Sequence, residues 1–95
     1  MTLRIALTDG FYGDTVVLSV EGGGHYRGEG LTTRTQISLA ASTELEAPEG
    51  ADALEVEIPT RGISERIELG GHENVTVAIR DGELQVGFPD RMGFA

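Results

Sequence analysis

Residues 75–88 read VTVAIRDGELQVGF, and this stretch decides the fold class. Apolar residues alternate with other residues on both sides of Asp81-Gly82, which is the pattern of two half-buried strands joined by a two-residue turn. Glycine readily takes the positive φ that such a turn requires, and aspartate tolerates it. The implied pairs are Ile79 with Leu84, Val77 with Val86, and Val75 with Phe88. Every pair is apolar on the same face, so the stretch predicts a β-hairpin against a core.

The same period-2 alternation recurs along the rest of the chain, in segments separated by glycine-rich breaks. Its apolar sets include Leu3-Ile5-Leu7, Val16-Leu18-Val20 and Leu54-Val56-Ile58. No stretch has convincing helical spacing. We therefore predict an all-β fold, a single antiparallel β-sandwich of seven to eight short strands that forms one domain over residues 1–95.

Two more hairpins are predicted between residues 43 and 68. If residues 48–53 form a loop, the pairs are Ala47 with Leu54, Leu45 with Val56, and Thr43 with Ile58. If residues 59–62 form a turn, the pairs are Ile58 with Ile63 and Leu54 with Ile67. The second register also sets Val56 opposite Glu65, which predicts a β-bulge or a local slip of the register at that point.

The charge of the chain excludes some partners. There are 16 acidic residues against 7 basic ones, and the net charge is −9. Nucleic acids and anionic membranes both require clustered positive charge, so we expect neither as a partner. The N-terminus lacks a basic segment followed by an apolar one, and no apolar run approaches the ~20 residues that span a bilayer. With no cysteine either, we expect a cytoplasmic protein without disulfides.

No residues are spaced for catalysis. There is no cysteine nucleophile and no GxSxG motif, and no pattern ties a serine to either histidine. His25 and His72, with a carboxylate such as Glu73, could hold zinc in a small metal-dependent hydrolase, although exposed turn residues are the commoner interpretation. Loop acids such as Asp9 and Asp14 leave calcium open, but an EF-hand spacing is absent. We expect no enzyme activity, no metal and no cofactor.

Two short segments are candidate contact sites. Phe11 and Tyr12 lie between glycines and could form an exposed aromatic tip, or could fold back to cover the core. In the tail, Met92 and Phe94 could pack over an open sheet edge or dock on another chain.

Four glutamates form a third candidate. The register of the first of these two hairpins sets Glu46 opposite Glu55 and Glu44 opposite Glu57 on one outer face. In the register of the second hairpin, Arg66 would face Glu55 and relieve part of the repulsion among these glutamates. The face could bind a cation or a basic partner, or could simply keep the sheet soluble.

Residues 13–22 (GDTVVLSVEG), residues 55–59 (EVEIP) and the hairpin of residues 75–86 resemble small bacterial β-sandwich accessory domains of the immunoglobulin-like or transthyretin-like type. The resemblance implies a domain that binds, spaces or presents, and it transfers no site residue. The immunoglobulin cysteine pair and core tryptophan are missing. Our leading hypothesis is a non-enzymatic interaction module with an unknown protein partner. The alternative is a structural protomer that self-associates through a sheet edge or the tail.

Overall fold

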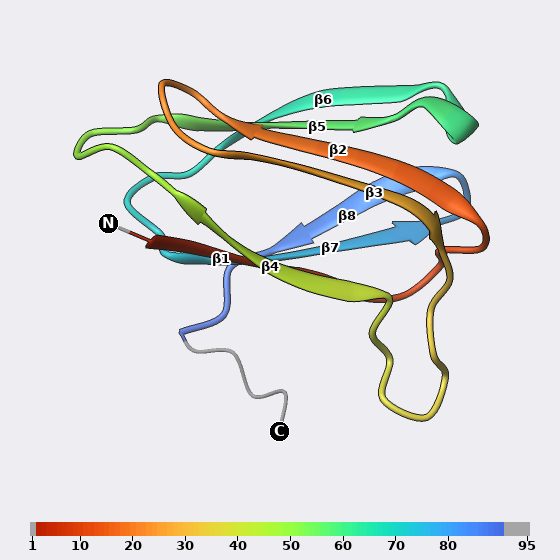
Figure 1. Cartoon of the computed structure of the whole chain (residues 1–95). Helices are drawn as coiled ribbons and strands as arrows, with labels where there is room; N and C mark the ends of the chain where they lie inside the picture. Colours follow the sequence, from red (N-terminus) through yellow and green to blue (C-terminus); the bar gives the residue numbers. More distant parts are fainter. Residues whose placement is uncertain (1, 91–95) are drawn as a thin grey trace.

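The computed structural model describes residues 2–90, which form eight strands in two four-stranded sheets. Figure 1 shows the sheets as two stacked layers. The strands are β1 (Thr2–Leu7), β2 (Asp14–Val20), β3 (His25–Leu31), β4 (Ala41–Glu46), β5 (Ala53–Ile58), β6 (Ile63–Glu68), β7 (Asn74–Arg80) and β8 (Glu83–Gly87), with a 3-10 turn η1 (Pro59–Arg61) after β5. One sheet has the order β4-β1-β7-β8 and is called the β1 sheet; the other has the order β3-β2-β5-β6 and is called the β2 sheet. The predicted all-β class is confirmed.

The core lies between the two layers and is built by the alternation seen in the sequence. The β1 sheet contributes Leu3, Ile5, Leu7, Leu45, Val75, Val77 and Ile79, and the β2 sheet contributes Val16, Leu18, Val20, Leu54, Val56, Ile58 and Ile67. All of these side chains are buried. Each stabilises the fold by about 1.5–3 kcal/mol relative to an exposed position.

One strand pair departs from the predicted antiparallel arrangement. Strands β1 and β7 run parallel, with Ile5 opposite Val75 and Leu7 opposite Val77. The other pairs in both sheets are antiparallel. Alternation fixes which face of a strand is buried but says nothing about its direction, so the sequence could not show this pair.

The predicted hairpin between residues 43 and 58 is wrong. Strand β4 pairs with β1, where Leu45 lies opposite Leu3, while β5 pairs with β2, where Val56 lies opposite Leu18. The segment between β4 and β5 therefore crosses from one sheet to the other. Both arrangements bury the same side chains against the same core, so alternation cannot distinguish them.

The other two predicted hairpins form, with two corrections. In the β5–β6 hairpin Ile58 faces Ile63, as predicted. Val56 faces Glu65 without a shift in register, so the expected bulge or local slip is wrong. In the β7–β8 hairpin Asp81 and Gly82 have φ of 54° and 79°, and the pairs Ile79–Leu84 and Val77–Val86 are confirmed. The ladder ends at Thr76 and Gly87, so the pair of Val75 with Phe88 does not form.

Candidate interaction site

The loop of residues 9–13 carries the aromatic pair, and the structure separates its two members. Phe11 is only 3% exposed and belongs to the core, so its predicted role at an exposed tip is wrong. Tyr12 is 82% exposed, the most exposed of the large apolar side chains that the structure describes.

A buried carboxylate fixes the backbone beneath Tyr12. The side chain of Asp14 is 3% exposed, and Oδ2 accepts the amide of Tyr12 at 2.9 Å. The Thr60 hydroxyl donates to Oδ1 at 2.7 Å. Arg61 forks onto both oxygens at 3.0 Å each, and its Nη2 also donates to the carbonyl of Gly10 at 2.9 Å. Four donors fill the four lone-pair positions of this carboxylate, which leaves none for a calcium ion.

The same contacts set the charge of the pair. Burial by itself raises the pKa of Asp14, but the hydrogen bonds from Arg61, Tyr12 and Thr60, with the charge of Arg61, outweigh it and hold the pKa below its usual value. The hydrogen bond to Asp14 raises the pKa of Arg61. A carboxylate that stays ionised and fully bonded is a structural group and a poor proton donor.

Threonines hold the opposite side of the loop. The Thr33 hydroxyl accepts the amide of Phe11 at 3.0 Å and donates to the carbonyl of Thr8 at 2.6 Å. The Thr32 hydroxyl accepts the amide of Gly13 at 2.9 Å. The loop is therefore bonded on both flanks, to η1 on one side and to the β3–β4 connection on the other.

Gly10 brings the loop against strand β7. Its φ is +89°, and a Cβ at this position would overlap the carbonyl oxygen of Ile79. The amide of Ile79 donates to the carbonyl of Asp9 at 2.8 Å. Only glycine combines this backbone angle with so close an approach.

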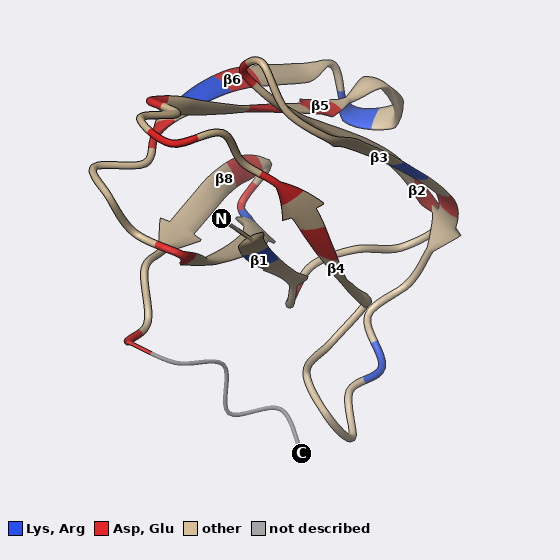
Figure 2. Ribbon diagram, turned by 60° about the vertical axis from the view of Figure 1, so that its left-hand side comes forward, with Lys and Arg blue, Asp and Glu red and all other residues tan. Residues whose placement is uncertain are grey.

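The predicted acidic face does not form. Glu44 and Glu46 lie on β4 in the β1 sheet, whereas Glu55 and Glu57 lie on β5 in the β2 sheet. Figure 2 shows red, acidic segments on β4 and on β5, which lie in different layers. The cause is the sheet crossing between β4 and β5, which replaces the expected hairpin.

Arginines meet two of these glutamates. Arg4 Nε lies 3.4 Å from Glu44 Oε1, and Arg66 Nη1 lies 3.3 Å from Glu55 Oε1. Arg66 also contacts Glu21 at 3.0 Å and Glu68 at 3.4 Å, with about half of its side chain exposed. The contact of Arg66 with Glu55 was predicted from the β5–β6 register. Exposed pairs of this kind contribute little to stability.

The remaining sequence candidates do not assemble into a site. His25 is exposed at the start of β3, and His72 stacks on Phe88 with ring centroids 4.6 Å apart. Within residues 2–90, no three His, Cys, Asp or Glu side chains are placed to hold a metal ion. Met92 and Phe94 lie outside the described residues.

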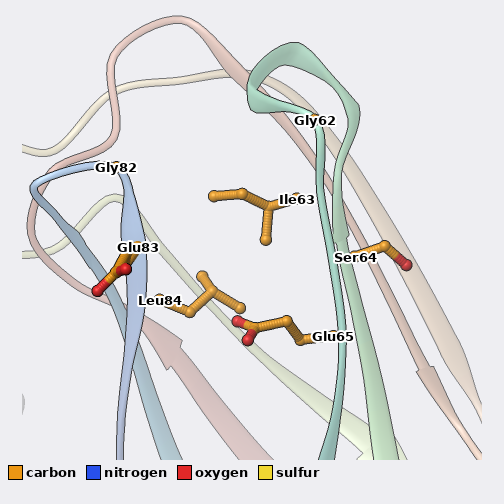
Figure 3. Close-up of a pocket in the computed structure, with 7 residues that line it drawn as sticks. All are labelled: Gly62, Ile63, Ser64, Glu65, Gly82, Glu83 and Leu84. Atoms are coloured by element: carbon orange, nitrogen blue, oxygen red, sulfur yellow. The ribbon is translucent and has the colours of Figure 1, made fainter.

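A cleft that the sequence did not predict opens between strands β6 and β8. Its volume is about 440 Å³, and its lining includes Ile63, Glu65, Glu83 and Leu84. Figure 3 shows Ile63, Glu65 and Leu84 converging on it from the two strands. The one feature of the sequence that could have indicated the cleft is Glu65, a charged residue at an inward-facing position. A charge there is tolerated because β6 is an edge strand and the inner face reaches solvent.

The opposite side of the sandwich is closed. There the amide of Gly24, in the β2–β3 turn, donates to the carbonyl of Glu46 at the end of β4, at 2.8 Å. A backbone hydrogen bond thus joins the two sheets at the β3–β4 side. The sandwich therefore has one bonded side and one side with a cleft.

Comparison with protein-family models, with curated proteins and with solved structures finds no match to this chain. Across residues 2–90, no helix has the length and hydrophobicity needed to cross a bilayer. The structure assigns the chain to the all-β class, with two packed four-stranded sheets.

Proposed function

We propose that this protein is a non-enzymatic interaction module that contacts a protein partner through Tyr12. One observation carries the proposal: Tyr12 is 82% exposed on a backbone that a buried, fully bonded Asp14 holds in place. Tyrosine offers a large contact area with few rotatable bonds, and a prefixed loop loses little entropy on binding. Both properties suit a binding residue at an interface.

The neighbours of Tyr12 already perform the structural tasks in this loop. Phe11 fills the core, and Asp14 satisfies the backbone and the guanidinium of Arg61. The exposed ring of Tyr12 is not needed for either task. Contact with another molecule is the simplest explanation for an exposed ring at this position.

We also propose the transthyretin-like arrangement of the sandwich over the immunoglobulin-like one. In the immunoglobulin arrangement the first, second, fifth and fourth strands share one sheet. Here β1 and β4 belong to one sheet, while β2 and β5 belong to the other. Accessory domains of this type bind or present, which agrees with an interaction module.

The structural half of the proposal is tested by comparing adjacent substitutions. Phe11→Ala should lower the free energy of unfolding by about 3–5 kcal/mol, because it leaves a cavity in the core. Tyr12→Ala should change it by less than about 0.5 kcal/mol, because the side chain is exposed. Urea denaturation measures both. A large cost for Tyr12→Ala would make Tyr12 a structural residue and overturn the proposal.

The binding half is tested with displayed libraries of small proteins panned against the full chain. Binders that use Tyr12 should weaken by about tenfold or more on Tyr12→Ala, as is typical of an aromatic hot spot. Ile37→Ala is the matched control, since Ile37 is 54% exposed in the β3–β4 connection. If the selected binders are all indifferent to Tyr12→Ala, Tyr12 is not the contact residue.

A second candidate is a structural protomer that self-associates through a sheet edge. The observation in its favour is β8, whose residues Leu84–Gly87 carry no charge at the free edge of the β1 sheet. Light scattering over a tenfold range of concentration would show a stable dimer if this candidate is right. The version that uses Met92 and Phe94 stays a prediction, and deletion of residues 90–95 tests it by the same measurement.

A further inference from the structure

We propose that the cleft and the free edge of β8 bind an extended segment of a partner protein that alternates apolar and basic side chains. This surface is separate from Tyr12, and the proposal does not depend on the role of that residue. The segment would add a strand to the β1 sheet beside β8.

Strand β8 is the least protected of the four sheet edges. Strand β3 has a register shift against β2 and two glycines, and β4 carries Glu44 and Glu46. Strand β6 turns Glu65 toward the inner face. Strand β8 carries one charge, Glu83 next to the turn, and its other residues, 84–87, read LQVG with no charge, no proline and no register shift. Natural proteins normally block edges with such devices, so an unblocked edge is available for pairing.

The backbone of β8 presents a regular set of free hydrogen-bonding groups. In a two-residue hairpin the pair next to the turn, here Arg80 and Glu83, exchanges both of its hydrogen bonds, and the bonded pairs then alternate along the ladder. Gln85 and Gly87 therefore bond to β7. The N–H and C=O groups of Leu84 and Val86 point away from β7, toward the position of an added strand. Extended peptides recognise this array by strand addition.

Apolar side chains lie on the inner side of the same edge. Leu84 and Val86 face inward with their partners Ile79 and Val77, yet Val86 is 37% exposed. Ile63 lies across the cleft on β6. A strand paired with Leu84 and Val86 would direct alternate side chains into the cleft and cover this apolar surface.

Unpaired carboxylates make the occupant basic. Glu65 on β6 turns toward the cleft, whereas Glu83 on β8 borders it with its side chain on the outer face, where the outward side chains of an added strand would lie. In the described part of the chain neither carboxylate makes an ion pair. The cleft lining has no lysine or arginine. A second copy of this chain would bring a further charge of −9, which opposes self-pairing. A segment with arginine or lysine beside its apolar residues complements both the charge and the edge.

The probe is a capped, fluorescent peptide of alternating valine and arginine, long enough to cover the five residues of β8. Fluorescence anisotropy with the full chain should show saturable binding that weakens as salt is raised. The same peptide with alternate backbone amides methylated cannot complete the ladder and should bind at least about tenfold more weakly. A version with glutamate for arginine should lose binding to a similar degree.

Matched variants locate the site. Val86→Pro removes one outward N–H without removing a hydrogen bond to β7, and it should weaken peptide binding by about tenfold. Val86→Thr keeps this N–H, so it should bind the peptide nearly as tightly as the wild type. Glu65→Gln and Glu83→Gln should each weaken binding by about threefold. Glu57→Gln, on the outer face of the β2 sheet, is the charge control. Tyr12→Ala should leave peptide binding unchanged, which separates this proposal from the proposed function.

Three results would overturn the proposal. The first is no saturable binding of the valine–arginine peptide to the wild-type chain. The second is equal binding of the methylated and unmethylated peptides, which would exclude strand addition. This comparison needs only wild-type protein, so it tests the proposal even if Val86→Pro fails to fold. The third is a stable wild-type dimer that excludes the peptide and that Val86→Pro dissociates, which would assign the edge to a second copy.

Discussion

Asp14 shows how one residue can organise a loop that connects two strands of different sheets. Its carboxylate joins the start of β2 to Thr60 and Arg61 of η1, and holds the amide of Tyr12. The sequence offered Asp14 only as one of several loop acids. Its partner, Arg61, lies 47 positions away, so no local pattern could have identified the pair.

Asp14 should contribute a stability that depends on pH, and replacing it should remove that contribution. The folded pKa of Asp14 lies below its unfolded value of about 3.9, so its contribution is complete above that pH and is lost as the pH falls through the folded value. Asp14→Asn should therefore cost about 3 kcal/mol at neutral pH, and the gap from wild type should narrow below about pH 4. Urea denaturation across the pH range measures this gap. Asp9→Asn is the exposed control, and a gap for Asp14→Asn that is the same at every pH would contradict the assignment.

The aromatic pair and Glu65 show what residue type alone leaves open. The sequence makes Phe11 and Tyr12 equally able to fill a core or an interface, and the packing of the loop against the core decides which ring is buried. Glu65 was interpreted as a bulge because it fell at an inward position. The edge location of β6 removed that conflict by exposing the position to solvent.

At the scale of elements, the pairing of strands joined by short turns could be predicted from the sequence, and the pairing of strands far apart in the chain could not. The β7–β8 and β5–β6 hairpins have short turns that fix their register, so Ile79–Leu84 and Ile58–Ile63 could be predicted. The pairing of β4 with β1 and of β1 with β7 joins distant segments. Nothing in a period of two identifies such partners.

The central and edge strands of the β1 sheet should respond differently to the same substitution. Val77 and Val86 are directly opposite each other, but Val77 is 0% exposed and Val86 is 37% exposed. Val77→Ala should lower the free energy of unfolding by about 2–3 kcal/mol, and Val86→Ala by less than about 1 kcal/mol. Chemical denaturation of the two variants tests this. Equal costs would mean that another surface covers β8 in solution.

At the scale of the whole molecule, the net charge is −9, and Figure 2 shows acidic segments in both layers. The four glutamates first assigned to one face divide between two layers. Long-range repulsion among the 16 acids opposes the compact state.

Salt should stabilise this protein. Raising the ionic strength from about 0.01 M to about 1 M shortens the Debye length from ~30 Å to ~3 Å, which screens the net repulsion. We expect the free energy of unfolding to rise by about 1 kcal/mol in sodium chloride. The double variant Glu46→Gln with Glu57→Gln makes the net charge less negative, so its free energy of unfolding should rise less with salt. A fall in stability with salt would instead show that the arginine–carboxylate pairs dominate.

The sequence by itself determined the class of the fold, the inner face of most strands and the two short hairpins. These features follow from local physics, because alternation and turn chemistry act over a few residues. Only the tertiary structure decided that β1 and β7 run parallel, that β4 and β5 belong to different sheets, and that a cleft opens between β6 and β8. It also decided that Phe11 is buried while Tyr12 is exposed. The strand pairings join segments far apart in the chain, and other pairings would bury the same apolar side chains, so alternation leaves no distinguishing pattern. The cleft and the separate fates of Phe11 and Tyr12 depend on how such segments pack against one another in space.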